Sequence, residues 1–410
     1  MKSFRTVVFW CHLLTGVVAG VVVLIMSVTG VLLTYEKQVM VWANTRAHTV
    51  TPPSAGAALK PSVEAVIGKV ISTEGEPPTS LTVRADPRAP WEAAYGRERT
   101  VFLNPHTGEV MGTGAPGVRH FFRTVTDWHR WLAASGERRD LGKAVTGACN
   151  LGFLFLVVSG LYLWWPRNWA RSAVRNVTQF RRGLSGRARD FNWHNVLGFW
   201  FCVPLFLVVL SATVISYPWA SNLVFRAAGE SPPVRRGPPR DGGGPGESRE
   251  AERVSLEGLD RAWARAERQV PGWKIISLRS PASAGDELAF TVDRGTGGQP
   301  HLRDRLTLDR RTGEIVEWEP YASNTRGQRA RSFLRFAHTG EVAGIIGQTI
   351  AGLASAAGAV LVWTGLALTW RRFGAWRARR RPGRRRGMAR PLRIEDEPAG
   401  IASGESRRSG

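Results

Sequence analysis

The sequence predicts an α-helical membrane protein: a four-span helical bundle with two tandem α+β domains outside the cytoplasm. The first observation behind this fold class is that the chain of 410 residues contains four long apolar segments. They cover residues 7–35, 144–165, 191–217 and 342–370. A helix rises about 1.5 Å per residue, so each segment is long enough to cross a bilayer. The first segment is too long for the core of a signal peptide and is expected to remain as an anchor.

The second observation is an internal repeat. Adding 182 to each position aligns 9–35 with 191–217 without a gap, and this places His12 on His194 and Gly16 on Gly198. An offset of 205 aligns Thr107-Gly108-Glu109 with Thr312-Gly313-Glu314, and Ser159-Gly160-Leu161 with Thr364-Gly365-Leu366. Both halves start on the same side of the membrane, which predicts a pseudo-twofold axis along the membrane normal.

The third observation is the distribution of basic residues, which predicts the topology. Of the net charge of +23, segments 1–6, 166–190 and 371–410 carry +2, +6 and +9. Basic residues beside span ends mark the cytoplasmic side, so both termini and the loop 166–190 are expected in the cytoplasm. The tail 371–410 is expected to be disordered. Its arginines are typical of topology and of attraction to anionic lipid, and nucleic-acid binding is the less favoured interpretation.

The segments 36–143 and 218–341 are therefore expected on the other side, and they follow one plan. Each begins with an amphipathic helical pattern, continues with strands, and ends in a helix that leads into the next span. The first segment has these elements at 61–72, 79–86, 91–96, 99–113 and 119–132, and the second at 255–270, 272–281, 287–293, 304–318 and 331–338. The Gly- and Pro-rich stretch 229–250 is expected to be a disordered loop.

The repeat also separates the histidines. Three have no histidine at a repeat-related position and are interpreted as surface residues: His48, His106 and His301. His12 matches His194, and an offset of 209 matches His129 with His338. His120 is an alternative to His129, but arginine stands 209 positions further on.

The two histidine pairs predict metal ligation. Neutral imidazole is the commonest metal ligand, and haem iron takes axial imidazole. Two histidines related by a twofold axis can bind one iron from both sides. His12, Gly16 and Gly20 share one helix face, where the missing side chains leave room for a flat macrocycle or allow helices to pack closely. The three cysteines form no CxxC pair, so no cysteine-ligated metal site is expected.

Several short motifs resemble the PepSY-associated transmembrane-helix family, the iron-regulated inner-membrane proteins of bacterial siderophore uptake. They are the His-x-x-x-Gly starts of the first and third spans, SGLYLWWP at 159–166, FAHTGEV at 336–342, and the hairpins NPHTGEV at 104–110 and DRRTGEI at 309–315. The resemblance covers about residues 1–375. It implies that the two outer domains are PepSY-like and that the protein is a multi-pass protein of the bacterial inner membrane.

The resemblance also implies a function. Members of this family are thought to be haem-containing reductases that release iron from ferric siderophores in the periplasm. Carried over, this makes His12, His194, His129 and His338 the axial ligands of two haem b groups, with no separate catalytic residue. Some relatives carry a fused flavin domain, for which the tail after Arg371 is too short. Quinol and a separate flavoprotein both stay open as the electron donor.

Two other functions are alternatives. A non-catalytic PepSY membrane protein that binds peptides or restrains a protease gives the paired histidines no role, and it would be colourless. A transporter needs charged side chains in its spans to bind a coupling ion or substrate, and the four apolar segments contain none. Transmembrane electron transfer to ferric iron is therefore the favoured hypothesis.

Overall fold

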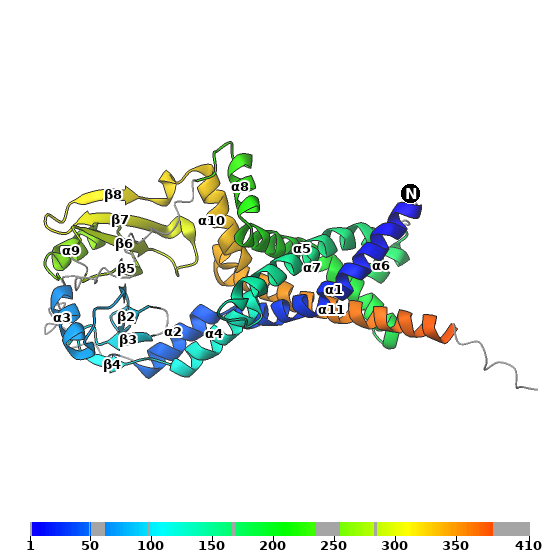
Figure 1. Ribbon diagram of the computed structural model, residues 1–410, viewed down its shortest axis with the longest axis horizontal. Coiled ribbons are helices and arrows are strands. Elements are labelled where there is room, and N and C mark those ends of the chain that lie inside the picture. Colours follow the sequence, from blue (N-terminus) through cyan, green and yellow to red (C-terminus); the bar gives the residue numbers. More distant parts are fainter. Residues whose placement is uncertain are drawn as a thin grey trace, which may run out of the picture.

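The computed structural model describes residues 2–48, 50, 62–96, 99–165, 169–233, 255–282 and 285–379. Over this part of the chain the molecule consists of a bundle of long helices with a β-sheet at one end of it (Figure 1). The start of α1 and the end of α11 both lie at the end of the bundle away from the sheet (Figure 1).

The bundle consists of the four predicted spans. They form helices α1 (Lys2–Leu33), α5 (Arg138–Trp164), α7 (Gly186–Ser216) and α11 (Gly344–Arg379). All four are long and apolar enough to cross a membrane. Large apolar side chains cover the outside of the bundle, for example Val18 and Ile346, which are 74% and 70% exposed. Such a surface is stable in lipid, so the protein is a membrane protein.

The order of helices around the bundle decides which side chains meet at its centre. Helix α1 packs against α5 and α11, and α7 packs against the same two helices. Helices α1 and α7 therefore occupy opposite corners, with their side chains directed across the bundle core. Bundle cores of this kind hold cofactors between facing helices.

Three segments expected to be irregular are partly ordered. Helix α11 continues to Arg379, so the prediction of a disordered tail is wrong for 371–379. Arg and Ala favour helix, and this stretch extends a span that is already helical. The loop 166–190 contains α6 (Arg171–Thr178). In the predicted loop 229–250, Glu230 accepts a hydrogen bond from the backbone N–H of Gly327, and 234–250 lies outside the described residues, as does 380–410.

The two outer segments form one continuous antiparallel sheet. Its strands are β1 (Ser80–Arg84), β2 (Trp91–Tyr95), β3 (Arg99–Leu103), β4 (Val110–Gly112), β5 (Ile275–Arg279), β6 (Glu287–Asp293), β7 (Arg303–Asp309) and β8 (Ile315–Glu319). The strand order is β4-β3-β2-β1-β5-β6-β7-β8. Strand β1 pairs with β5 over its whole length, which joins the two halves edge to edge.

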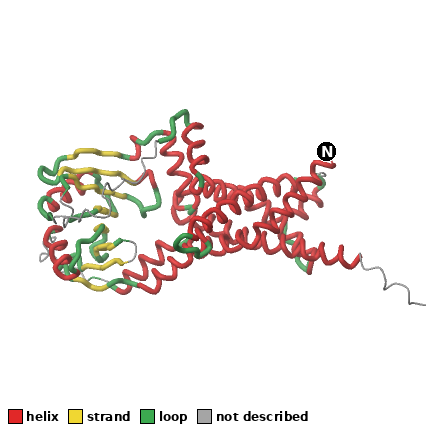
Figure 2. Tube along the Cα trace, viewed as in Figure 1, coloured by secondary structure: helices red, strands yellow, loops and turns green. Residues whose placement is uncertain are grey.

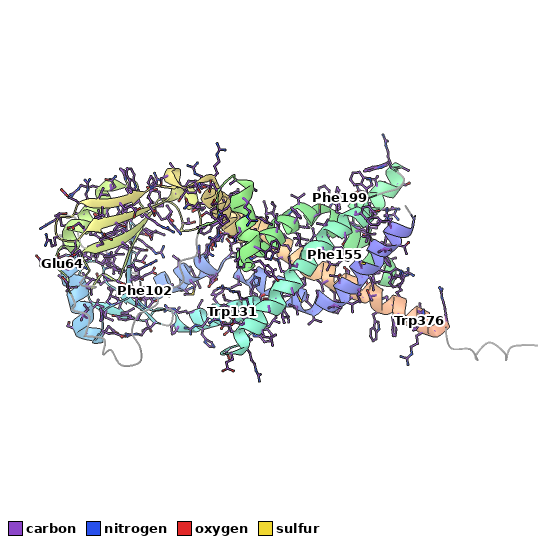
Figure 3. All side chains as sticks on the ribbon, turned by 45° about the horizontal axis from the view of Figure 1, so that its top comes forward. Glu64, Phe102, Trp131, Phe155, Phe199 and Trp376 are labelled. Atoms are coloured by element: carbon purple, nitrogen blue, oxygen red, sulfur yellow. The ribbon has the colours of Figure 1, made fainter. Side chains whose placement is uncertain are left out.

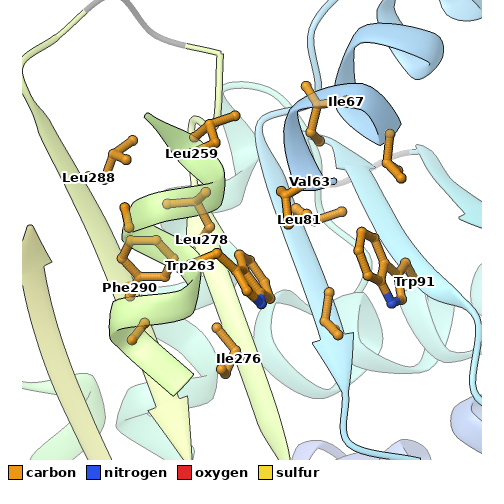
Figure 4. Packing of buried hydrophobic residues seen from close by; sticks show 14 of the residues in the cluster. Val63, Ile67, Leu81, Trp91, Leu259, Trp263, Ile276, Leu278, Leu288 and Phe290 are labelled. Carbon is orange, nitrogen blue, oxygen red and sulfur yellow. The ribbon is translucent and has the colours of Figure 1, made fainter. Parts of the chain in front are cut away.

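One face of the sheet carries the core. Helices α3 (Val63–Glu74) and α9 (Leu259–Gln269) pack on this face, and apolar side chains from both halves form one cluster beneath them (Figure 4). The rings of Trp91 and Trp263 stack with centroids 6.3 Å apart across the junction. The opposite face is polar: the hydroxyls of Thr82 and Ser277 lie 2.9 Å apart across the junction. Neither half has a closed core without the other.

Four more helices connect the sheet to the bundle (Figure 2). They are α2 (Glu36–Ala47), α4 (Pro116–Trp131), α8 (Pro218–Ala227) and α10 (Arg326–His338). The short helices η1 (Pro300–Leu302), η2 (Tyr321–Ser323) and η3 (Glu341–Ala343) complete the second half. The residue pattern predicts α4 and α10 but not α2 and α8, which directly follow spans and lack a clear apolar stripe. Trp131, at the end of α4, lies where the two parts of the molecule meet (Figure 3).

Candidate functional site

A tight turn after α4 positions His129. Helix α4 ends at Trp131, and Leu132 and Ala133 follow with φ angles of 54° and 57°. Non-glycine residues occupy this left-handed region only at a cost in free energy, which the surrounding contacts must offset. Helix α5 then passes so close that a Cβ on Gly142 would lie 2.2 Å from the carbonyl oxygen of Trp131. The turn directs the last part of α4 against α1.

A second tight turn positions His338, the last residue of α10. Gly340 follows with a φ of 75°, and a Cβ there would lie 2.2 Å from the carbonyl oxygen of Gly347. The first turn of α11 therefore crosses directly behind the end of α10. Any larger side chain at Gly340 would push the two elements apart and move His338.

These turns bring His129 and His338 together, and we call them the sheet-proximal pair. Their ring centroids are 6.2 Å apart with an interplanar angle of 51°. Two imidazoles on opposite sides of one metal ion, each with a metal–nitrogen distance of about 2 Å, have centroids about 6 Å apart. The observed spacing fits a shared metal. His120, the alternative to His129, is exposed and does not belong to the pair.

His12 and His194 form the sheet-distal pair, on α1 and α7 at the far end of the bundle. The two rings are close enough to interact electrostatically. His12 Nδ1 lies 2.8 Å from Ser159 Oγ on α5, and His194 Nδ1 lies 3.0 Å from Thr364 Oγ1 on α11. The residue after each hydroxyl is a glycine, where a Cβ would lie 3.4 Å from the imidazole Cε1. Both rings therefore rest against a helix backbone.

The sheet-proximal rings have corresponding partners. His129 Nδ1 lies 2.9 Å from Thr29 Oγ1 on α1, and His338 Nδ1 lies 2.9 Å from the carbonyl oxygen of Val208 on α7. Ser211 Oγ is 3.5 Å from His338 Nδ1. Thr29 and Ser211 are 182 positions apart, the offset that aligns the two spans. In each of the four rings, Nδ1 thus lies within hydrogen-bond distance of an oxygen atom on a neighbouring helix.

The partners fix the tautomer of each ring. A carbonyl oxygen only accepts, so His338 must donate from Nδ1. The three hydroxyls already donate to carbonyl oxygens of their own helices: Ser159 to Phe155, Thr364 to Val360, and Thr29 to Ile25, at 2.6, 2.8 and 2.7 Å. His12, His194 and His129 therefore also donate from Nδ1. Each Nε2 carries a free lone pair, the arrangement of a metal-ligating histidine with an oriented ring.

The match to known proteins covers this whole constellation. The family described as PepSY-associated TM region matches residues 9–372, a range that contains all four paired histidines, α5 and α7 in full, and most of α1 and α11. The chain belongs to the PepSY-associated TM family. No curated protein is similar enough to count as a match.

In this PepSY-associated TM protein the sheet-proximal rings are neutral. Burial, together with the neighbouring His338, lowers the pKa of His129 to about 4. Burial also lowers the pKa of His338. Neutral imidazole is the form that binds a metal, so the site is prepared for ligation at physiological pH.

The remaining histidines have local roles, and two of them are not plain surface residues as interpreted from the sequence. His48 stacks on Phe102 with ring centroids 5.4 Å apart, and its Nε2 accepts a hydrogen bond from the N–H of Gly114. His106 has a buried Nε2 in the hairpin turn after β3. His301 packs edge-on against Tyr321 at 6.5 Å. All three lie in the sheet part of the molecule, away from the two pairs.

Among the described residues, no group of three or more His, Cys, Asp or Glu side chains could hold a metal ion. Each histidine pair supplies two ligands only. A metal held here needs its other ligands from a group that the pair can hold between its rings, and a porphyrin has this geometry. The internal repeat predicts the histidine pairs from the sequence, whereas their hydroxyl partners become visible in the packing of the helices. The offset of 205 that aligns Ser159 with Thr364 is the signal that could have found two of them.

Proposed function

We propose that the protein is a haem-containing inner-membrane oxidoreductase that passes electrons across the membrane to ferric iron in a periplasmic complex, such as a ferric siderophore. One observation carries the proposal: two histidine pairs with free Nε2 atoms follow one another along the bundle core. His12 and Thr29, the partner of His129, lie on one helix at positions about 25 Å apart along its axis. The two pairs therefore lie towards opposite faces of the membrane.

His12 and His194 would hold one b-type haem, and His129 and His338 would hold the other. Haem supplies reversible one-electron chemistry at a potential set by its ligands and by burial. The protein keeps the rings in one tautomer through Ser159, Thr364, Thr29 and the carbonyl of Val208. The apolar bundle excludes water around them.

A cavity between the sheet and helices α2 and α4 supports the proposed site for the electron acceptor. It has a volume of about 520 Å³, and its lining includes Lys37, Arg84, Arg119 and Arg303 against Glu92 and Asp293. Phe336, two residues before His338, lies 5.9 Å from Lys37 Nζ and 5.8 Å from Arg303 Cζ, measured to the ring centroid. Three of these cations are paired with carboxylates, Lys37 with Glu341, Arg84 with Glu92 and Arg303 with Asp293. Arg119 remains as one excess positive charge, which suits a ferric complex with anionic oxygen ligands.

The proposed topology follows from the basic segments. The start of α1 and the end of α11 share the sheet-distal end (Figure 1), and they carry the basic residues that mark the cytoplasmic face. The sheet would then lie in the periplasm. An electron would enter at His12 and His194 and leave past His129 and His338.

The test uses purified protein in liposomes with a ferric siderophore outside and a reductant inside. The wild type should be coloured, with reduced-minus-oxidised bands of b-type haem. His338→Ala should keep the sheet-distal haem reducible from inside, yet lower the rate of external ferric reduction by about 100-fold, because the last ligand pair is broken. His120→Ala is the matched control, since it removes an exposed histidine from the helix that carries His129. A folded but colourless wild type would contradict the proposal and favour a peptide-binding or protease-restraining role.

A further inference from the structure

A second cavity lies beside the sheet-distal pair, and we call it the distal cavity. It has a volume of about 370 Å³ and lies between α7 and α11, lined by Arg189, Asp190, Trp193, Ala359, Val360, Trp363 and Thr364. Thr364 also accepts the hydrogen bond of His194 Nδ1. A molecule in this cavity is therefore separated from the distal pair by one hydroxyl group. We propose that the distal cavity binds the headgroup of a membrane quinol, which is the electron donor of the protein; this inference rests on the proposed function.

Asp190 gives the cavity a buried polar group of the kind that a quinol hydroxyl needs. Its side chain is 2% exposed. Oδ1 accepts hydrogen bonds from Arg189 Nε and Nη2 at 3.0 and 2.9 Å. Oδ2 is buried and accepts no hydrogen bond among the described residues, although Arg371 Nη1 lies 3.1 Å away in an ion pair. A buried oxygen without a hydrogen bond is costly, and a ligand hydroxyl would remove that cost.

The two halves of the bundle differ at this point. Helices α1 and α5 hold His12 as α7 and α11 hold His194, so they provide an internal comparison. At the positions corresponding to Arg189 and Asp190, α1 has only apolar residues, and α5 has larger ones where the second half has Ala359 and Val360. Val7, Val8, Leu154 and Phe155 replace Arg189, Asp190, Ala359 and Val360 in the comparison. Only the half formed by α7 and α11 therefore combines an open cavity with a buried carboxylate.

The position of the cavity favours a lipid-soluble donor. Trp193 and Trp363 are 42% and 64% exposed on the lipid-facing side of the bundle, and tryptophan typically marks the membrane interface. A quinol reaches such an opening sideways through the bilayer, with its ring between aromatic and apolar walls and one hydroxyl on Asp190. A soluble flavoprotein needs an exposed docking surface and has no use for this opening. A lipid acyl chain needs no carboxylate.

The chemistry balances with ferric iron as the oxidant. The hydroquinone loses two electrons and two protons and becomes a quinone. Its hydroxyl protons pass to Asp190 Oδ2 and on to water at this end of the bundle. The electrons pass Thr364 and His194 one at a time, and each reduces one external ferric ion to the ferrous state. One quinol therefore yields one quinone, two ferrous ions and two protons.

The first test is photolabelling of the full-length protein in nanodiscs with arylazido derivatives of decylubiquinone and of a naphthoquinone. We expect label on peptides containing 189–193 or 359–364. Ala359→Leu/Val360→Phe copies the side chains of the first half and should lower labelling at least 10-fold by filling the cavity. Ile346→Phe, an exposed position near the other end of α11, is the control and should label like the wild type. Labelling needs no haem, so this result is independent of the proposed function.

The second test measures the rate at which decylubiquinol and menadiol reduce the purified protein, with dithionite as the control reductant. The double variant should react at least 10-fold more slowly with quinol and normally with dithionite. Asp190→Asn should retain the photolabel but slow quinol oxidation at least 10-fold, and Asp190→Glu should restore it. Label confined to other sites, no displaceable label, or variants that all oxidise quinol at the wild-type rate would overturn the inference. These outcomes are expected if the electron donor is a flavoprotein or if the cavity holds only a membrane lipid.

Discussion

At the scale of single residues, the paired histidines depend on hydroxyl groups that perform two tasks. Ser159 and Thr364 donate to their own helix and accept from a histidine on the neighbouring helix. The repeat was sufficient to select the histidines from the sequence. It did not reveal their partners, because Ser and Thr in a span most often bond only to the preceding turn. Only the packing of α1 on α5 shows that the Ser159 hydroxyl also faces His12.

If the sheet-distal pair binds haem as proposed, Ser159→Ala should weaken that binding about 10- to 100-fold, because the His12 ring loses the group that orients it. The measurement is haem retention during titration with a competing apo-protein. Thr369→Val is the matched control, since Thr369 makes the same kind of bond to Gly365 on α11. Equal retention by Ser159→Ala and wild type would show that the hydroxyl does not orient the ring.

At the scale of elements, α3 and α9 cap each other across the junction of the two halves. Asp260 at the start of α9 accepts hydrogen bonds from the N–H groups of Val63 and Glu64 and from the hydroxyl of Ser62. Glu64 in turn accepts from the N–H of Asp260 at 3.3 Å. Each helix thus supplies an acceptor to the first turn of the other, where backbone donors have no partner in their own helix.

Asp260→Ala should destabilise α3 by about 1–2 kcal/mol, the usual cost of removing an N-terminal cap. This corresponds to a decrease in hydrogen-exchange protection of α3 by a factor of about 5–30. Hydrogen–deuterium exchange of the full chain measures it directly. Asp86→Ala removes an exposed turn carboxylate that accepts from the N–H of Arg88 and serves as the control. Unchanged protection of Val63–Glu74 would mean that packing on the sheet alone holds the helix.

The strands themselves were predictable, since alternation and turn residues placed all eight of them. The pairing of the two sets of strands into one sheet was not predictable. Alternation indicates which face of a strand is buried, such as Leu81 and Val83 in β1, but it carries no information on which edge pairs. The pairing of β1 with β5 depends on the shared core under α3 and α9, and such a core forms only from both segments together.

At the scale of the whole molecule, the proposed topology places the sheet on one side of the membrane and α6 on the other. In intact cells, a membrane-impermeant thiol reagent should label Thr107→Cys and Thr312→Cys in the hairpin turns, because both lie in the sheet. Arg175→Cys in α6, at the sheet-distal end, should react only after the cells are opened. The three native cysteines are first replaced by serine. Reaction of Arg175→Cys in intact cells together with protection of both hairpins would reverse the proposed orientation.

The width of the sheet has a mechanical consequence for the sheet-proximal pair. Helix α4 follows β4 and α10 follows β8, the two outermost strands of the sheet. Eight strands at a spacing of about 4.8 Å separate these edges by about 34 Å. At their other ends the same helices bring His129 and His338 to a centroid distance of 6.2 Å. The sheet therefore holds α4 and α10 apart at one end while the two helices converge at the other. A change in the twist of the sheet would alter the angle between the two imidazole rings without any movement of the spans.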